Sequence, residues 1–143
     1  LHRLIRRQRQ MCIRDRFNLE PIAKIRSMAV VGTDPVLMLS GPIPATRKAL
    51  DQAKLKPEDI NLAEINEAFS SVVGAWRKEF PEINYENVNA NGGSIAIGHP
   101  LGATGARLMT NLIHEMKRNK LKYGLQAICE GGGTANATIV ELV

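Results

Sequence analysis

A glycine-rich stretch in the second half of the chain displays a single histidine. Residues 91–107 read NGGSIAIGHPLGATGAR and hold five glycines, one proline and His99. Glycine permits backbone conformations and close approaches that a Cβ forbids, and Pro100 biases His99 toward an extended conformation. The stretch therefore predicts a rigid loop that holds one imidazole. Such an imidazole can donate an N–H to a developing oxyanion or exchange a proton near neutral pH; hydrogen bonding to a neighbouring carbonyl is the alternative.

Asn66 occupies a predicted junction between a short strand, residues 62–65, and a helix. A side-chain amide at such a junction caps the helix by default, or it can hold a water molecule in place. Glu67 follows in the first turn, where a carboxylate compensates the helix dipole, and we interpret it as structural support. Asn66 is therefore a candidate site residue with two open roles.

Cys129 ends an apolar predicted strand, residues 124–129, and precedes Glu130 and three glycines. Without that context it would be interpreted as a buried small hydrophobe. The glycines allow close backbone approach to the thiol, which permits a tuned pKa. His114, in contrast, lies among charged neighbours on a predicted helix, where exposure is expected. We expect Asn66, His99 and Cys129 to converge in one pocket, with His114 outside it.

Hydrophobic periodicity and turn residues place these candidates on alternating strands and helices. The order predicts an α/β fold of βαβαβαββ type, a mixed sheet with helices on both faces. Prolines at the first helical turn mark the start of the first helix and of a single turn at Pro57. The predicted strands are 23–31, 62–65, 87–90, 124–129 and 138–143, and the predicted helices are 42–53, a segment with one apolar face from Phe69 to Phe80, and 105–118.

The positive charge of the chain is concentrated at its start. The formal charge is +5, and residues 1–16 carry six arginines against one aspartate, whereas residues 17–143 carry equal numbers of basic and acidic side chains. We interpret residues 1–16 as a basic leader, non-native or disordered, and residues 17–143 as one domain. A genuine nucleic-acid arm and a mitochondrial-type targeting segment are the alternatives. Two cysteines make no disulfide framework, which fits a reducing compartment.

Several kinds of site are not supported by the sequence. The glycine runs lack the Gly-Lys-Ser/Thr of a phosphate loop, and none opens a helix as GxGxxG. Cys129 and His99 are far apart in the chain without paired ligands nearby, so no metal site is expected. The aromatic residues do not alternate with basic ones, so nucleic acid is not an expected partner. No apolar run reaches the length of a membrane span, so no membrane partner is expected either.

The motifs together resemble the C-terminal catalytic motifs of the thiolases, in the same order and at similar separations. They are GPIPATRKAL at 41–50, NEAF at 66–69, GGSIAIGHPLGATGAR at 92–107 and CEGGG at 129–133. The resemblance covers residues 17–143 and implies the fold of a thiolase C-terminal half. One departure is Thr134-Ala135-Asn136, which stands where many thiolases continue with a further glycine. It leaves the shape of the acyl-pocket floor, and thus the chain-length preference, open.

The resemblance implies an acyltransferase that works on coenzyme A thioesters. Thiolases join two acyl-CoA molecules, or cleave a 3-ketoacyl-CoA with CoA, through an acylated cysteine. That nucleophile belongs to the N-terminal half of the enzyme, which this sequence does not contain. The resemblance thus implies the C-terminal catalytic half of an acyl-CoA:acetyl-CoA C-acyltransferase, inactive as a fragment. The NEAF motif points to the acetyl-CoA acetyltransferase or the general 3-ketoacyl-CoA thiolase group, and acetyl-CoA C-acetyltransferase is the activity we expect first.

Four residues carry catalytic roles by this resemblance. His99 would help to activate the nucleophile and, with a water held by Asn66, stabilise the thioester enolate. Cys129 would be the acid/base that moves the α-proton. Gly131 would lend a backbone N–H to the oxyanion formed on the acylated cysteine.

The resemblance also implies partners and a location. No metal or further cofactor is expected, because acyl-CoA and CoA are substrates, and residues that bind CoA are not assigned. The missing N-terminal half would be a partner, and the complete enzyme would be a homodimer or homotetramer. A cytoplasmic location is expected, or a mitochondrial or peroxisomal one in a eukaryote. The alternative from another class is a stand-alone CoA or acyl-CoA binding module without catalysis.

Overall fold

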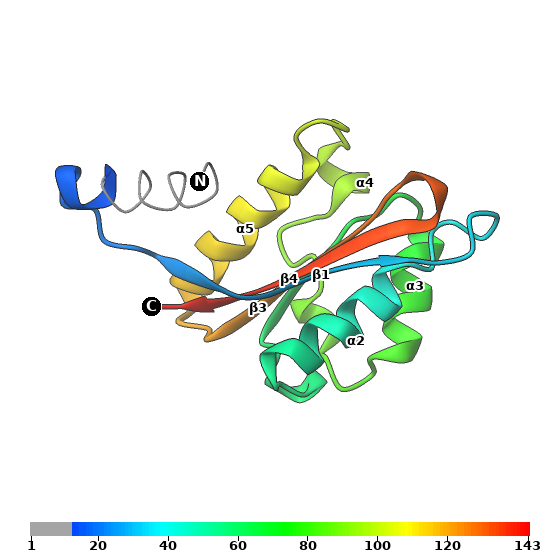
Figure 1. The fold of residues 1–143 in the computed structure, drawn as a ribbon, viewed down its shortest axis with the longest axis horizontal. Helices are drawn as coiled ribbons and strands as arrows, with labels where there is room; N and C mark the ends of the chain where they lie inside the picture. The colour runs from blue at the N-terminus through cyan, green and yellow to red at the C-terminus, as the bar shows by residue number, and fades with distance from the viewer. Residues whose placement is uncertain (1–12) are drawn as a thin grey trace, which may run out of the picture.

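A four-stranded mixed sheet forms the centre of the protein in a computed structural model that describes residues 13–143 (Figure 1). Its strand order is β1 (Ala23–Gly32), β4 (Thr134–Leu142), β3 (Tyr123–Cys129) and β2 (Leu62–Ile65). The pairs β1–β4 and β4–β3 are antiparallel, and β3–β2 is parallel. The predicted α/β class with a mixed sheet is therefore confirmed.

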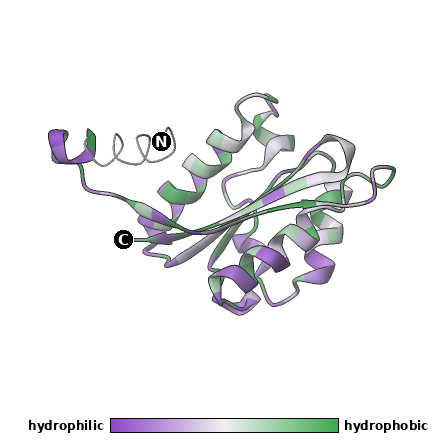
Figure 2. Ribbon diagram, in the orientation of Figure 1, coloured by the Kyte–Doolittle hydropathy of each residue, from purple (hydrophilic) through white to green (hydrophobic). Residues whose placement is uncertain are grey.

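Helices cover both faces of the sheet, as predicted (Figure 1). On one face, α2 (Pro42–Ala53) and α3 (Ser70–Glu79) enclose the larger core, which contains Trp76, Phe80 and Leu125. On the other, α5 (Thr104–Asn119) buries Leu112 and Met116 against Leu62 and Val140. Hydrophobic and hydrophilic segments alternate along α2 and α5 (Figure 2), because each helix has one buried face. The remaining elements are α4 (Ser94–Ile97) and the 3₁₀ turns η1 (Pro57–Asp59), η2 (Tyr85–Asn87) and η3 (Gly131–Gly133).

The first helix shows how local sequence sets these elements. Pro42 opens α2, where its missing N–H needs no partner, and Lys54 ends the helix in a left-handed conformation with φ of 57°. Ala45, Ala49 and Ala53 recur on one face and are almost fully buried, so the helix packs closely on the sheet. Ser27 of β1 donates a 2.8 Å hydrogen bond to the Ala49 carbonyl and joins the two elements.

The strand predicted at 87–90 is wrong. Residues 85–87 form η2, and Val88 makes one isolated parallel bridge to Ala63. Asn89 then takes a φ of 52°, which ends any extended run. Its side chain replaces the backbone as the partner of Ile65, accepting from the Ile65 N–H at 2.8 Å and donating to the Ile65 carbonyl at 3.0 Å. The closing strand β4, in turn, begins at Thr134, four residues earlier than predicted.

The junction after β2 also differs from the prediction. The helix begins at Ser70 rather than beside Asn66, and Phe69 occupies its N-cap position. Asn66 therefore does not cap the helix. Phe69, predicted on the buried face with Trp76, is 63% exposed because it lies outside the first helical turn.

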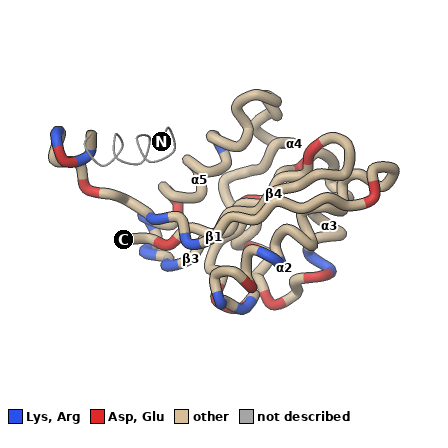
Figure 3. Tube along the Cα trace, viewed as in Figure 1, with Lys and Arg blue, Asp and Glu red and all other residues tan. Residues whose placement is uncertain are grey.

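The described part of the chain shows a mixed surface. Basic and acidic residues alternate along the trace in Figure 3, in keeping with the balanced charge of residues 17–143. Among the described residues, no helix has the length and apolar character needed to cross a bilayer. Residues 13–17 form an exposed helical turn, and the first twelve residues of the predicted leader lie outside the described residues. The interpretation of the leader stays a prediction.

Replacing Trp76 by phenylalanine is expected to lower the free energy of unfolding by about 1–3 kcal/mol. The Trp76 indole N–H donates a 3.0 Å hydrogen bond to Thr46 Oγ1, and both residues are fully buried. The substitution leaves that hydroxyl without its partner in a dry core. Adding Thr46→Val to Trp76→Phe removes the orphaned hydroxyl, so the double variant should be no less stable than the single one in urea denaturation. Strictly additive losses would contradict this interpretation.

Candidate active site

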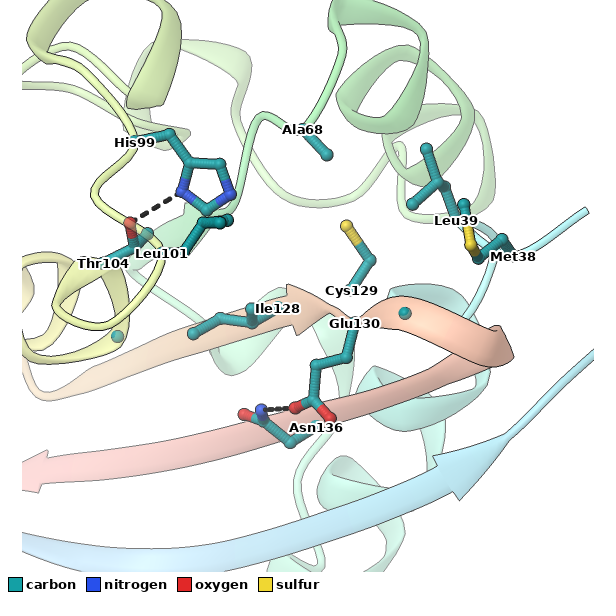
Figure 4. Close-up of a pocket in the computed structure, with 12 residues that line it drawn as sticks. Met38, Leu39, Ala68, His99, Leu101, Thr104, Ile128, Cys129, Glu130 and Asn136 are labelled. Atoms are coloured by element: carbon teal, nitrogen blue, oxygen red, sulfur yellow. Dashed lines mark hydrogen bonds between the residues drawn. The ribbon is translucent and has the colours of Figure 1, made fainter. Parts of the chain in front are cut away.

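A cleft of about 490 Å³ opens where β3 ends and α5 begins. Two predicted site residues face the same space in it, His99 from the glycine-rich loop and Cys129 from the end of β3 (Figure 4). Gly131 lies on its rim. Much of the remaining lining is apolar: Met38, Leu39, Ala68, Leu101 and Ile128.

The His99 ring is held by one neighbouring hydroxyl. Its Nδ1 lies 2.7 Å from Thr104 Oγ1, and that hydroxyl donates at 2.9 Å to the Pro100 carbonyl. Because the single hydroxyl proton is already used, Thr104 Oγ1 must accept from Nδ1–H. Nε2 is then the ring nitrogen that can gain or lose a proton. The arrangement gives an imidazole that can take up a proton at Nε2 and then donate it.

The loop before His99 is fixed at the start of α4 by the NEAF segment. Glu67 Oε2 accepts the Ile95 N–H at 2.9 Å, and Asn66 Oδ1 accepts from Ser94 Oγ at 2.8 Å. Gly93 is required by this packing, since a Cβ there would lie 2.3 Å from the Glu67 carboxyl carbon. A carboxylate at the start of a helix also meets its positive end. Glu67 is therefore a structural support, but at the start of α4 and not, as predicted, in the first turn of α3, which begins only at Ser70.

Arg107 holds the other end of α4. Its guanidinium donates to the Ile97 carbonyl at 3.0 Å and to the Gly98 carbonyl. Gly98 has a φ of 89°, which lets the chain leave α4 and turn into His99. The carbonyl end of α4 therefore meets a cation, as its dipole favours. Sequence reasoning missed both Arg107 and Thr104, although both lie within the glycine-rich motif, on the first two turns of the helix that follows the histidine.

Cys129 is a buried thiol, 7% exposed. Burial raises its pKa above that of an ordinary cysteine, and the negative charge of Glu130 adds to this, whereas the nearby Asn66 side-chain amide and backbone N–H groups partly offset it. At neutral pH the group is therefore a thiol that carries a proton. In this state it suits proton transfer better than nucleophilic attack.

Asn66 lies behind the cleft and does not line it. The residue is 1% exposed, and its backbone N–H is bonded to the Ala127 carbonyl at 2.9 Å. Its Nδ2 lies on the Cys129 side, near enough to favour the thiolate, but makes no complete hydrogen bond with any described residue. The expected convergence thus holds for His99 and Cys129 within the cleft, with Asn66 in the layer beneath. His114 is exposed and outside it, as predicted.

The CEGGG turn presents the Gly131 backbone at the rim of the cleft. Within the described residues, the Gly131 N–H has no hydrogen-bond acceptor. Gly132 and Gly133 follow with φ of 70° and 80°, and the Gly133 carbonyl accepts from both the N–H and the hydroxyl of Thr33, at 2.7 and 2.8 Å. The turn is therefore anchored at Gly133 and leaves a donor free at Gly131.

The departure at residues 134–136 changes one flank of the cleft. Asn136 belongs to the cleft lining, and its Nδ2 donates to Glu130 Oε1 at 2.5 Å. Thr134 Oγ1 donates in the same cluster, 3.1 Å from Glu130 Oε2. These contacts hold the Glu130 carboxylate against the sheet (Figure 4). Neither this flank nor any other part of the described chain contains a cluster of three or more metal-ligating side chains.

Gly133→Ala is expected to lower the free energy of unfolding by about 2–5 kcal/mol. The turn would hold the new alanine in a left-handed conformation, with φ of 80°. Its Cβ would also lie 2.6 Å from the Thr33 carbonyl oxygen and 3.0 Å from that of Asp34. Gly131→Ala is the matched control, because no atom lies within 4 Å of its added Cβ, and stability should change by less than about 0.5 kcal/mol. Urea denaturation of both variants measures the difference. Equal stabilities would show that Gly133 does not anchor the turn.

Comparison with known proteins identifies what the chain is similar to. The family model "Thiolase, C-terminal domain" matches residues 19–142. A steroid 3-ketoacyl-CoA thiolase of Mycobacterium tuberculosis is 56% identical over 86% of this chain and 30% of its own length. An acetyl-CoA acetyltransferase of Cupriavidus necator is 47% identical, over 86% and 31%. The chain thus spans about a third of the length of these relatives.

Solved structures give the same result for the fold. The acetyl-CoA acetyltransferase of Bacillus anthracis superposes with a TM-score of 0.86 at 42% identity, over 91% of this chain and 33% of that one. Human mitochondrial 3-ketoacyl-CoA thiolase superposes with a TM-score of 0.87 at 38% identity, over 92% and 33%. The predicted resemblance in fold is confirmed.

Proposed function

The chain belongs to the thiolase family through its C-terminal domain, and from this premise we propose that it is the C-terminal catalytic half of an acyl-CoA:acetyl-CoA C-acyltransferase. The observation that carries the proposal is the pairing of two groups in one cleft. His99 presents a free Nε2 on a fixed imidazole, and Cys129 is a buried thiol that keeps its proton at neutral pH. An imidazole and a protonated thiol are suited to moving protons around a thioester carbonyl.

Each residue has a proposed role in this chemistry. In the cleavage direction, Cys129 gives its proton to the enolate carbon of the departing acetyl-CoA, and in the synthetic direction it takes the α-proton back. His99 Nε2 accepts the proton of the nucleophilic thiol and then donates to the enolate oxygen and stabilises it. The Asn66 amide, whose Nδ2 is unpaired among the described residues in the layer beneath the cleft, is the group proposed to hold a water beside His99. The Gly131 N–H stabilises the oxyanion on the acylated cysteine. Removing one such donor typically costs about 10²–10³ in turnover.

Acetyl-CoA C-acetyltransferase is the specificity we propose first, with a longer 3-ketoacyl-CoA as the competing outcome. Two relatives named acetyl-CoA acetyltransferase are each 47% identical to the chain, and a relative named steroid 3-ketoacyl-CoA thiolase is 56% identical. The apolar lining of the cleft accommodates an acyl group, and the Thr134–Asn136 segment shapes its flank. We also propose that the complete enzyme is a cytoplasmic homodimer or homotetramer that binds CoA with its N-terminal half.

A chimera tests the proposal. Residues 20–143 replace the matching C-terminal segment of the Cupriavidus necator acetyl-CoA acetyltransferase, which supplies the rest of the enzyme. The chimera should cleave acetoacetyl-CoA with CoA, and His99→Ala or Cys129→Ala should each lower turnover by about 10²-fold or more. Comparing acetoacetyl-CoA with longer 3-ketoacyl-CoA substrates then decides the acyl preference.

His114→Ala is the matched control for His99→Ala, since His114 is the other histidine of the described chain and lies outside the cleft. Its turnover should equal that of the parent chimera. A folded chimera that binds CoA but keeps its activity in Cys129→Ala would overturn the proposed acid/base role. A folded chimera that never turns over, together with binding of CoA by the isolated 143-residue chain, would favour a binding module.

A further inference from the structure

Glu64 places a carboxyl group in the dry layer between the sheet and α5. The residue lies on β2, which is buried along its whole length, and is 0% exposed. Neither of its carboxyl oxygens is hydrogen-bonded to a described residue. An isolated buried carboxylate is costly, so this group needs either a proton or a positive neighbour.

The charged surroundings of Glu64 identify that neighbour. Burial raises its pKa most, to about 7, and the negative charges of Glu67 and Glu115 add to this. Arg107 acts in the opposite direction and favours the carboxylate. Glu67 and Glu115 are occupied elsewhere, Glu67 with Asn89 and α4, and Glu115 with Arg118 and nearby amides. The positive charge that acts on Glu64 is therefore the one that also holds the His99 loop.

Arg107 has a free atom for this interaction. Its terminal nitrogens donate to the carbonyls of Ile97 and Gly98, while its Nε is shielded from solvent and has no partner among the described residues. The two terminal nitrogens of the guanidinium are thus hydrogen-bonded to the His99 loop, whereas the buried Nε donates to no described residue. Glu64 and Arg107 each hold a buried polar atom near the start of α5 that is unpaired among the described residues. Glu64 is paired in register with Gln126 of β3, and Gln126 donates at 2.7 Å to the carbonyl of Gly105, two residues before Arg107. No ion pair within 4 Å joins Glu64 and Arg107 in the described chain, so the guanidinium acts on the carboxylate across the low-dielectric interior and offsets part of the cost of its burial.

We propose that Glu64 is a positioning residue for His99: its carboxylate orients the Arg107 guanidinium, which holds the Ile97 and Gly98 carbonyls and so fixes the loop that carries the imidazole. Its benefit to catalysis rests on the proposed function, but the orientation of the loop does not. The effect acts through Arg107, because Glu64 itself does not reach the cleft.

Hydrogen exchange in the 143-residue chain tests the proposal without any assay of activity. The Ile97 and Gly98 amides donate to the Gly93 and Ser94 carbonyls at 3.0 and 2.9 Å, so their protection reports whether α4 is intact. Protection corrected for intrinsic exchange should rise between pH 6 and pH 8 as Glu64 ionises. In Glu64→Gln, which keeps the shape and loses the charge, protection at pH 8 should fall about fivefold and no longer depend on pH. Glu64→Asp should retain the rise.

The amides of α2, on the opposite face of the sheet, are the internal control and should be unaffected. Arg107→Gln should lower protection as Glu64→Gln does, and the double variant should lower it no further, because the two act as one unit. The proposal is overturned if Glu64→Gln keeps wild-type protection and pH dependence, if α2 loosens equally, or if the two substitutions are additive. If a folded chimera shows no turnover while the His99 loop of the 143-residue chain still shows pH-dependent protection, the proposed function is refuted and this inference stands.

Discussion

Acetoacetyl-CoA incubated with CoA and the isolated 143-residue chain is expected to remain intact. Covalent acyl transfer needs a thiolate beside a base, and the sequence contains two cysteines, Cys12 in the basic leader and Cys129. Cys129 is buried, and its raised pKa keeps it protonated at neutral pH. The free Gly131 N–H supplies one oxyanion donor at most. Groups that act as a unit lose nearly all their effect when one is missing, so turnover should be at background.

The measurement is the loss of the ketoacyl thioester over time, with Cys129→Ala as the control and buffer as the reference. The parent chain and the variant should be indistinguishable from buffer. Turnover above buffer that disappears in Cys129→Ala would show that Cys129 is itself a nucleophile, and the proton-transfer role would be wrong. Turnover that survives in Cys129→Ala would place the chemistry outside the described cleft.

Turn chemistry and apolar periodicity predicted most of the fold because both act locally. Pro42 and Pro57 start helical turns where predicted, and residues 62–65 form the predicted strand. The strand predicted at 87–90 is wrong because a side chain there replaces the backbone as a partner. Asn89 bonds both backbone groups of Ile65 through its amide, so a segment that resembles a strand makes one bridge and turns away. The pattern of hydrophobic residues along the sequence does not indicate when a side chain takes the place of a backbone hydrogen-bond partner.

The candidate site was predicted in part, for a related reason. His99, Cys129 and Gly131 lie in unusual local sequence, and the structure brings them to one cleft. The residues that hold them act across the fold. Arg107 reaches back nine or more residues to the His99 loop, and Glu64 reads as an ordinary polar position of a short strand. Only the covering of β2 on both faces makes that carboxyl dry, and this depends on the packing of α5 against the sheet.

Glu64→Gln is expected to make the chain more stable above neutral pH and to leave it unchanged at low pH. In the folded state burial raises the Glu64 pKa to about 7 from the value of 4.5 of an exposed glutamate. Between these values the folded chain keeps a proton that the unfolded chain has lost, so the contribution of this group to stability falls as pH rises through the window. The full loss amounts to about 3 kcal/mol, at 1.36 kcal/mol for each pKa unit. Glutamine cannot ionise and escapes this loss.

Urea denaturation of the two proteins at intervals from pH 4.5 to pH 8 measures the effect. The difference in free energy of unfolding should be near zero at pH 4.5, grow in favour of Glu64→Gln up to about pH 7, and level off beyond it. Glu115→Gln is the contrasting control. Hydrogen bonding, first from Asn91, lowers the Glu115 pKa, so its contribution has the opposite sign: it is present above 4.5 and lost on acidification. Parallel curves for wild type and Glu64→Gln would mean that Arg107 already neutralises the buried carboxylate across this range. Glu64 would then be ionised in the folded chain at every pH tested, and the folded chain would retain no proton that the unfolded chain loses. Holding the His99 loop through Arg107 would in that case cost no stability as the pH rises.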